Sequence, residues 1–242
     1  MSLPNIRTLY DVVEATWPPA SITRVGPVTI RDGQGGGKRV SAGTVDGAFT
    51  EADLDAAEAA MLALGQYRIF MVREGEDTLD EALEVRGYEI VDPVNVYAAK
   101  AEDIATERPP RTAAIPGWEP LRIMEEIWAK GGIGPARINV MQRANGPKTG
   151  FVSRWNDQPA GTSFMAMHAG IGMVHAVEIL PHQRRQGVGR FLMRRAAFWV
   201  LEQGGHTLSV ICTQANEGAN GLYASLGMTV VGQYHYRQKT KD

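Results

Sequence analysis

The sequence predicts an α/β (α+β) fold with a mixed sheet. Helical and strand patterns alternate along the 242 residues, and the order of elements in the first half recurs in the second. Hydrophobic residues make up 44% of the chain and charged residues 21%, the proportions of an ordinary folded protein. The chain has 25 Lys and Arg residues and 27 Asp and Glu residues. This near balance produces no broad electrostatic field that would favour a nucleic acid or an anionic membrane as partner.

The chain lacks the marks of a secreted or membrane protein. No apolar run approaches the ~18–20 residues of a transmembrane helix. The start, Met1-Ser2-Leu3-Pro4-Asn5, lacks the regions of a signal peptide. Cys212 is the single cysteine and is interpreted as a small apolar residue of a strand. We expect a cytoplasmic protein without a metal site, and we leave a homodimer open.

A charged, proline-containing stretch at residues 106–117 is typical of a linker. It separates residues 1–105 from residues 118–242, and the two parts share a repeat at an offset of 140, the difference between positions 47 and 187. Three glycines of the first half match three of the second: Gly47, Gly65 and Gly87 match Gly187, Gly205 and Gly227. This spacing predicts two similar domains.

Hydrophobic periodicity predicts the same four elements in each half. The helices Thr50–Leu64 and Arg190–Gln203 each precede a short apolar strand, Tyr67–Val72 and Thr207–Cys212. Two short helices follow, each closed by a glycine, and a strand follows each of them. The short helices are Leu79–Arg86 and Gly218–Leu226, and the strands are Tyr88–Tyr97 and Met228–Tyr236. The second half adds the helices Leu121–Lys130 and Pro135–Ala144, the hairpin strands Lys148–Asn156 and Ala160–Ala169, and the strand Gly172–Ile179.

A basic loop with two glycines connects the strand ending at Ile179 to the helix beginning at Arg190. Free backbone N–H groups and the dipole at a helix N-terminus favour an anion, and Gly187 and Gly189 let the backbone approach it. A phosphorylated ligand is the expectation, although a structural turn would look similar. A Walker A loop and a dinucleotide fingerprint are excluded, because Gly-Lys-Ser/Thr is absent and Leu192 stands where the latter needs glycine.

The segment LPHQRRQGVG at 180–189 resembles the acetyl-CoA pyrophosphate loop of the GNAT superfamily of N-acetyltransferases, Gln/Arg-x-x-Gly-x-Gly/Ala. The stretch from Ala215 to Met228 resembles the family's second signature, in which an asparagine precedes a helix that carries a tyrosine. Met228 replaces the usual phenylalanine. The resemblance covers about Leu121 to Tyr236. It implies two GNAT-like halves, each with a mixed, mostly antiparallel sheet flanked by helices.

The resemblance also implies roles for individual residues. The co-substrate would be acetyl-CoA, and the acceptor would be the amine of a small molecule or a peptide. The implied cofactor contacts are the backbone of Val177, Glu178 and Ile179 with the pantetheine arm, the loop residues Arg184, Arg185, Gln186, Gly187, Val188, Gly189 and Arg190 with the pyrophosphate, and Asn216 and Tyr223 near the reacting end.

In this mechanism an amine attacks the thioester directly, and Tyr223 protonates the departing thiolate. The base that accepts the amine's proton is left open. His175 has a suitable pKa range, and Glu178 is the next candidate, expected on the opposite face of the strand because side chains alternate. His168 on the neighbouring strand is a further candidate, and solvent could also take the proton.

The first half keeps the layout but not the loop chemistry. At the offset of 140, Leu83 stands at the position of Tyr223, Phe49 at that of Gly189, and Asp46 at that of Gln186. Residues 1–105 therefore resemble a degenerate GNAT-like copy, and residues 118–242 the catalytic domain. A CoA-binding sensor without turnover is the alternative function, and a purely structural role is a third hypothesis.

Overall fold

The computed structural model describes residues 2–239, which divide into two compact units. The first unit comprises residues 2–18, 96–212 and 216–231, and the second comprises residues 19–95, 213–215 and 232–239. The predicted linker at 106–117 lies within the first unit and includes a short strand. The compact units therefore differ from the two predicted sequence domains, whose bounds stay a prediction.

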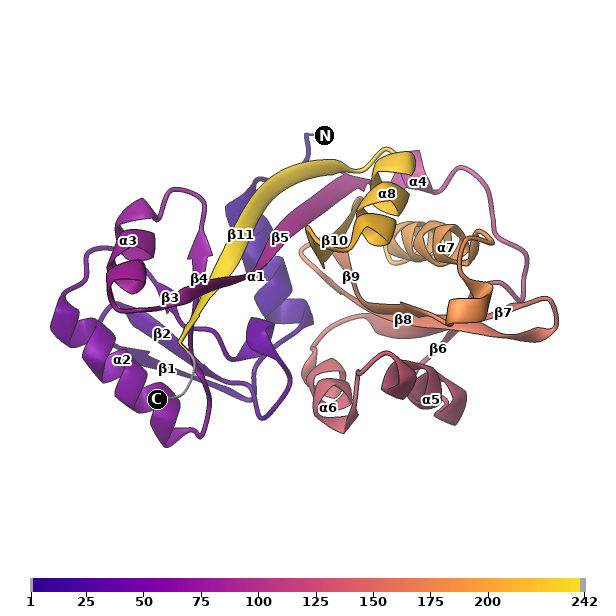
Figure 1. The fold of residues 1–242 in the computed structure, drawn as a ribbon. Coiled ribbons are helices and arrows are strands. Elements are labelled where there is room, and N and C mark those ends of the chain that lie inside the picture. Colours follow the sequence, from indigo (N-terminus) through magenta and orange to yellow (C-terminus); the bar gives the residue numbers. More distant parts are fainter. Residues whose placement is uncertain (1, 240–242) are drawn as a thin grey trace. The chain divides into compact units, whose positions relative to one another are not determined.

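The first unit is built on a sheet with the strand order β5-β10-β9-β8-β7-β6 (Figure 1). The strands are β5 (Glu89–Lys100), β6 (Ile115–Gly117), β7 (Lys148–Trp155), β8 (Gln158–His168), β9 (Ile171–Ile179) and β10 (Thr207–Thr213). Neighbours from β6 to β9 pair antiparallel, whereas β9 and β10 are parallel. The predicted hairpin is confirmed, but its turn is the two residues Asn156-Asp157 rather than the predicted four, Asn156 to Pro159.

Helices cover both faces of this sheet. They are α1 (Ile6–Thr16), α4 (Ala101–Ile104), α5 (Arg122–Lys130), α6 (Pro135–Arg143), α7 (Val188–Glu202) and α8 (Glu217–Ser225). In Figure 1, α7 lies on one side of β7–β9, and α5 and α6 lie on the other. The predicted apolar stripe of α7, including Leu192, Ala196 and Val200, packs on Phe151 and Val174 of the sheet. Burial of this stripe fixes which face of α7 meets the sheet, and the short connection from Ile179 to Val188 brings the N-terminus of α7 to the end of β9.

The second unit contains a small antiparallel sheet, β1 (Ser21–Val25), β2 (Val28–Asp32) and β3 (Thr44–Val45). It also contains β4 (Arg68–Arg73), which pairs antiparallel with β11 (Thr229–Lys239). The helices are η1 (Lys38–Val40), α2 (Glu51–Ala63) and α3 (Asp77–Val85). Leu54, Met61, Phe70 and Leu83 are fully buried in its core.

The structure confirms the repeat. Helix α3 begins at Asp77 and α8 at Glu217, and β5 begins at Glu89 and β11 at Thr229, so both pairs differ by 140 positions. The final strand of each half, however, pairs outside its own half: β11 pairs with β4, and β5 lies beside β10. The two halves therefore exchange their last strands.

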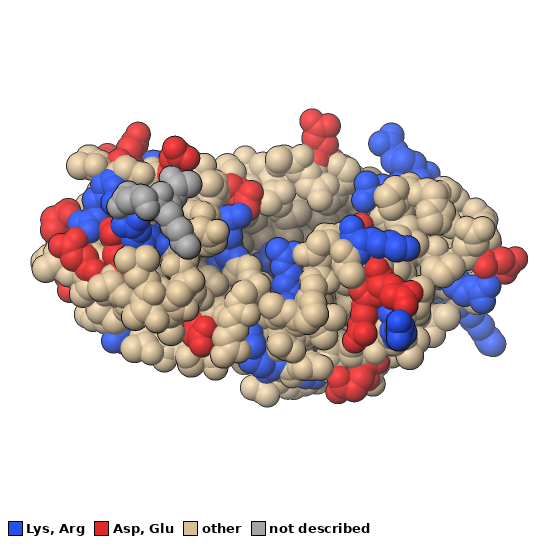
Figure 2. All heavy atoms as spheres, turned by 60° about the horizontal axis from the view of Figure 1, so that its bottom comes forward, with Lys and Arg blue, Asp and Glu red and all other residues tan. Residues whose placement is uncertain are grey.

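The described part of the chain gives two further observations about its surface and its helices. On the face drawn in Figure 2, the described basic and acidic side chains are interspersed rather than gathered by sign. None of the helices within residues 2–239 combines the length and the apolar character that crossing a bilayer requires.

Candidate functional site

Strand β9 separates from β10 before it ends. The parallel pairing runs from Ile171 and Thr207 to Val174 and Val210, and no pair is formed beyond it among the described residues. The last residues of β9 still pair with β8, because Glu178 is opposite Thr162. The backbone N–H of Leu180 donates to Ala160 on that side. Since backbone groups alternate along a strand, those of residues 177 and 179 point to the other, open edge.

A bulge at Ala176 interrupts β9 just before this open edge. Ala176 has a left-handed backbone (φ +51°), and the pairing with β8 shifts register opposite it, between Thr162 and Phe164. The indole Nε1–H of Trp128 on α5 donates to the Ala176 carbonyl at 2.8 Å. A bulge leaves its extra residue unpaired and changes the direction of the side chains that follow. Trp128 supplies the Ala176 carbonyl with the hydrogen-bond donor that the sheet does not supply.

The bulge overturns one prediction, that Glu178 and His175 lie on opposite faces. Val177 and Ile179 pack on the α7 side of the sheet with Val174. Glu178 lies on the α5 side, where a methyl group at Gly131 would collide with its carboxylate. His175 also lies on the side away from α7, against α1. Strict alternation fails because the bulge inserts one extra residue between them.

His175 is enclosed in the core, with 2% of its surface exposed. The Thr16 hydroxyl donates to the Val12 carbonyl at 2.7 Å, so it accepts from Nε2 of His175 at 2.9 Å. The Trp17 ring lies 4.9 Å from the His175 ring between centroids. Nε2 therefore carries a hydrogen in this arrangement and cannot accept a proton from an amine.

Glu178 on β9 and His168 on β8 lie at opposite ends of the β8–β9 pair. The Glu178 side chain is 18% exposed, and its Oε1 lies 3.4 Å from Nη2 of Arg184. His168 pairs with Ile171 at the start of β9, roughly 23 Å along the strand from Glu178 at ~3.3 Å per residue. The expectation that His168 approaches the end of β9 is therefore wrong.

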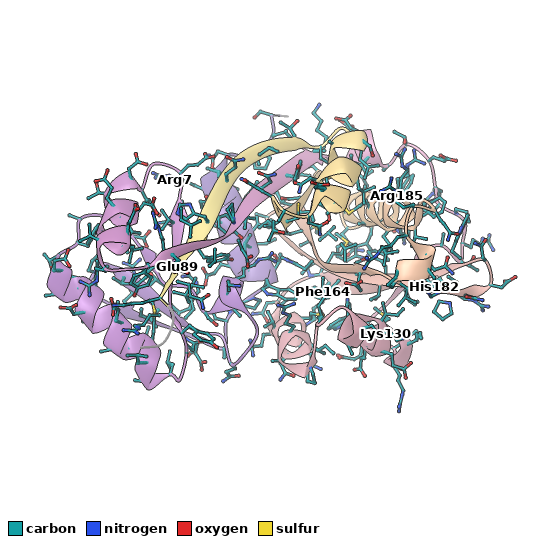
Figure 3. All side chains as sticks on the ribbon, viewed as in Figure 1. Arg7, Glu89, Lys130, Phe164, His182 and Arg185 are labelled. Atoms are coloured by element: carbon teal, nitrogen blue, oxygen red, sulfur yellow. The ribbon has the colours of Figure 1, made fainter. Side chains whose placement is uncertain are left out.

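The predicted basic loop has the shape of an anion site. After the short helix η2 (Pro181–Gln183), Arg185 and Gly187 have left-handed backbones (φ +64° and +84°). Gly187 is the N-cap of α7, and no side chain caps the helix there or adds an acid to its first turn. Arg185 and His182 are exposed on this loop (Figure 3). The first N–H groups of α7 are thus left without a side-chain acceptor in the described structure.

The other loop residues have several different contacts. Arg184 folds back, and its Nε donates to the Ile179 carbonyl at 3.0 Å, so its guanidinium lies on the edge of β9. Val188 is buried in the core. Gly189 allows close helix packing, because a Cβ there would lie 2.8 Å from Leu222 of α8. Arg190 Nη2 donates to the Ser225 hydroxyl of α8 at 3.2 Å.

Helix α8 carries the predicted tyrosine and asparagine. Tyr223 is 3% exposed and shares a core with Val177 and Ile179. Burial raises the pKa of Tyr223, and the nearby Cys212 and Tyr97 raise it further. A phenol with a raised pKa keeps its proton, as an acid must. The Asn216 side chain accepts from the Ala219 N–H at 3.1 Å, so it caps α8.

Sequence reasoning did not identify Asn220 as part of this site, and it left open whether Trp128 lines a pocket or fills the core. Asn220 Oδ1 accepts from the Tyr97 hydroxyl at 2.8 Å and from Cys212 Sγ at 3.4 Å, beside Tyr223. Only the position of Asn220 on the helix of Tyr223, one turn before it, could have indicated it. Nothing in the sequence near Trp128 indicated that it bonds to a strand 48 residues away.

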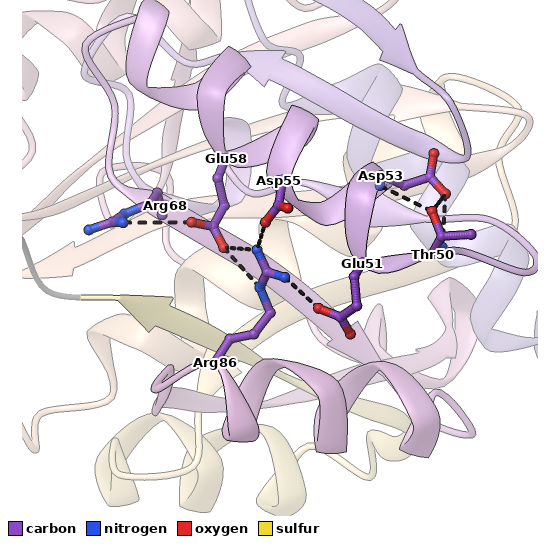
Figure 4. Close-up of polar contacts among 7 residues, drawn as sticks. All are labelled: Thr50, Glu51, Asp53, Asp55, Glu58, Arg68 and Arg86. Carbon is purple, nitrogen blue, oxygen red and sulfur yellow. Dashed lines mark hydrogen bonds and ion pairs between the residues drawn. The ribbon is translucent and has the colours of Figure 1, made fainter.

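The corresponding helix of the first half, α2, is closed at its N-terminus (Figure 4). The Thr50 side chain accepts from the Asp53 N–H, and the Asp53 carboxylate accepts from the Thr50 N–H at 2.8 Å. Hydrogen bonds to the Asp53 carboxylate from the Thr50 hydroxyl and from the Thr50 N–H lower the pKa of Asp53. Asp46, at the position of Gln186, pairs with Arg24 and Arg73. The N-terminus of α2 is therefore capped by a carboxylate of the chain itself, whereas the N-terminus of α7 has no such cap.

The comparisons with known proteins agree with this geometry. The model of the acetyltransferase (GNAT) family matches residues 119–228. A GCN5-related N-acetyltransferase from Kribbella flavida is similar over 97% of this chain and 95% of its own, with 18% identity and a TM-score of 0.71. A functionally unknown conserved protein from Staphylococcus epidermidis has 14% identity, coverage of 93% and 96%, and a TM-score of 0.71.

A tandem GNAT protein from the clavulanic acid biosynthesis pathway is 12% identical, with coverage of 93% of this chain and 86% of its own and a TM-score of 0.62. At these identities the solved structures show the fold alone. A search of curated proteins gave no match. The family model, the fold and the loop ahead of α7 lead to one conclusion: residues 119–228 of this chain are a domain of the acetyltransferase (GNAT) family.

Proposed function

We propose that the GNAT domain transfers the acetyl group of acetyl-CoA to the amine of a small molecule or a peptide. The uncapped, basic N-terminus of α7, which begins directly after the open edge of β9, carries this proposal. A helix N-terminus with free N–H groups suits a pyrophosphate, and an open strand edge suits the amide-containing pantetheine arm. The capped α2 restricts the proposal to the second half of the chain.

The residues around β9 fit the binding of acetyl-CoA. The N–H groups at the start of α7, together with Arg185 and Arg190, would hold the pyrophosphate. The backbones of Val177 and Ile179 would pair with the pantetheine arm. Because Arg184 donates to the Ile179 carbonyl, we expect its guanidinium to leave this carbonyl when the pantetheine arm pairs with it.

For the chemical step, we assign the base to Glu178 rather than to His175. Glu178 is partly exposed on the α5 side of the bulge, whereas His175 is enclosed in the core and its Nε2 is hydrogen-bonded to Thr16. The amine nitrogen forms a bond to the acyl carbon and gives its proton to Glu178, directly or through water. The carbon–sulfur bond breaks, and Tyr223 protonates the sulfur. Tyr223 packs in the same core as Val177 and Ile179, beside the open edge of β9, which supports this role.

Calorimetric titration of the full chain with acetyl-CoA tests the binding. We expect Arg185→Ala to weaken binding by about tenfold, because a charge-assisted hydrogen bond to phosphate contributes roughly 1.5 kcal/mol. Arg122→Ala is the matched control: its side chain is 90% exposed on α5, and it should leave the affinity unchanged. If the wild type does not bind acetyl-CoA, the proposal is wrong.

A panel of amines with detection of the released thiol tests the transfer. Release of CoA that depends on one amine class would support an acetyltransferase and identify its acceptor. Tight binding of acetyl-CoA with no thiol release from any amine would favour the alternative, a CoA-binding sensor without turnover.

A further inference from the structure

The loop ahead of α7 is fastened to the β7–β8 hairpin. The Asn156 side chain donates from Nδ2 to Gln186 Oε1 at 2.9 Å. Gln183, which is 3% exposed, donates from Nε2 to the Trp155 carbonyl at 3.3 Å. The Trp155 ring lies 5.0 Å from the ring of Phe191 on α7, between centroids. All of these residues belong to the first unit.

The tip of the hairpin is a tight turn. Asn156 and Asp157 have left-handed backbones (φ +50° and +57°), as a two-residue hairpin turn of this hand requires. Arg154 Nη2 donates to the Asp157 carbonyl at 2.7 Å across the turn. The side chain of Asn156 is therefore presented to the loop from a fixed backbone.

Gln186 connects this contact to the rest of the loop. Its Oε1 accepts from Asn156, and its Nε2 donates to the His182 carbonyl at 2.9 Å. The two bonds hold Gln186 between the hairpin and η2. Arg185, immediately before it, has a left-handed backbone that a side chain rarely adopts without external support.

We propose that Asn156 is a positioning residue that holds the loop in the shape that binds the pyrophosphate of acetyl-CoA. The inference rests on the proposed function and deepens it. A loop that is already ordered before binding loses less conformational freedom when the ligand arrives, so its affinity is higher. Asn156 touches no reacting atom, and its effect is confined to binding of the pyrophosphate half of the co-substrate.

The test compares Asn156→Gly with Asp157→Gly in the full chain. Glycine keeps the positive φ of the turn at either position, so each variant removes one side chain and adds the same backbone freedom. Only the Asn156 side chain bonds to the loop among the described contacts. We expect Asn156→Gly to raise KM for acetyl-CoA five- to tenfold with kcat within twofold, and Asp157→Gly to leave both within twofold.

Acetyl-pantetheine, an acyl donor without the pyrophosphate, distinguishes positioning from general damage. KM for this donor should be the same in the wild type and in Asn156→Gly. If KM rises equally for both donors, or equally in Asp157→Gly, the inference is wrong. Should Asn156→Gly fold poorly by circular dichroism, Asn156→Asp keeps the turn but has no donor for Gln186, and the same rise is expected.

The outcomes separate this inference from the proposed function. A wild type that binds acetyl-CoA beside an Asn156→Gly variant of equal KM and calorimetric Kd overturns the inference alone. A wild type that does not bind acetyl-CoA overturns both.

Discussion

Asp80 on α3 binds two basic side chains of β11, the strand that the second half contributes to the second unit. Its Oδ1 lies 2.7 Å from Nε of Arg237 and 2.7 Å from Nε2 of His235, and its Oδ2 lies 3.0 Å from Nη2 of Arg237. Arg237 is 5% exposed. The hydrogen bond from Arg237 lowers the pKa of Asp80 from 3.8 to about 2, against the opposing effect of burial. We predict that Asp80→Asn destabilises the protein.

The size and pH dependence of this loss follow from the pKa. A carboxylate whose pKa is lower in the folded state stabilises the fold above its unfolded pKa, and this contribution is lost as the pH falls toward the folded pKa. At about 1.4 kcal/mol per pKa unit, the lowering corresponds to about 2 kcal/mol at pH 7. At pH 3 about 1 kcal/mol remains. Because Arg237 would then stay buried beside a neutral amide, the loss at pH 7 should be no smaller than this.

Urea unfolding followed by far-UV circular dichroism at pH 7 and pH 3 measures the effect. Far-UV circular dichroism reports on the helices and strands of both units, whereas all five tryptophans lie in the first unit. Glu81→Gln is the matched control, since Glu81 is the next residue of α3 and is exposed. A loss in Asp80→Asn that is equal at the two pH values, or equal to that of Glu81→Gln, would refute the reasoning.

Three further substitutions test the site. Trp128→Phe leaves the Ala176 carbonyl without its donor, so we expect a loss of about 1–3 kcal/mol in urea unfolding and a lower kcat; an unchanged kcat would show that the bulge does not position the base. Gly187→Ala forces a side chain into a backbone with φ +84°, so we expect a cost of about 1–2 kcal/mol and weaker binding of acetyl-CoA by calorimetry, and equal affinity would contradict the loop assignment. Tyr223→Phe should lower kcat about a hundredfold with little change in KM, and an unchanged kcat across pH would remove Tyr223 as the acid.

Much of the fold and part of the site could be predicted from local spacing. The loop before α7, its glycines and the tyrosine of α8 are patterns within a few turns of chain, and the structure places them as expected around the end of β9. The repeat was also legible, because the elements keep their order and nearly their lengths. These features depend on helix caps, turn glycines and apolar periodicity, which are properties of neighbouring residues.

The exchange of β5 and β11 could not be predicted, because an apolar strand pattern does not specify which strand will be its neighbour. The pairing of β11 with β4 joins residues more than 150 positions apart. For the same reason the predicted domain boundary at residues 106–117 does not coincide with the bounds of the compact units.

The sequence by itself determined that a strand, a basic glycine loop and a helix N-terminus follow one another at residues 171–202, and hence where a phosphorylated co-substrate would bind. Only the tertiary structure decided which side chains face the α5 side of that strand. The reason is the bulge at Ala176, which depends on the pairing with β8 and on the indole of Trp128 rather than on any residue beside it in the chain. One extra residue in a strand reverses the alternation of all that follow, and it places Glu178 on the same face as His175.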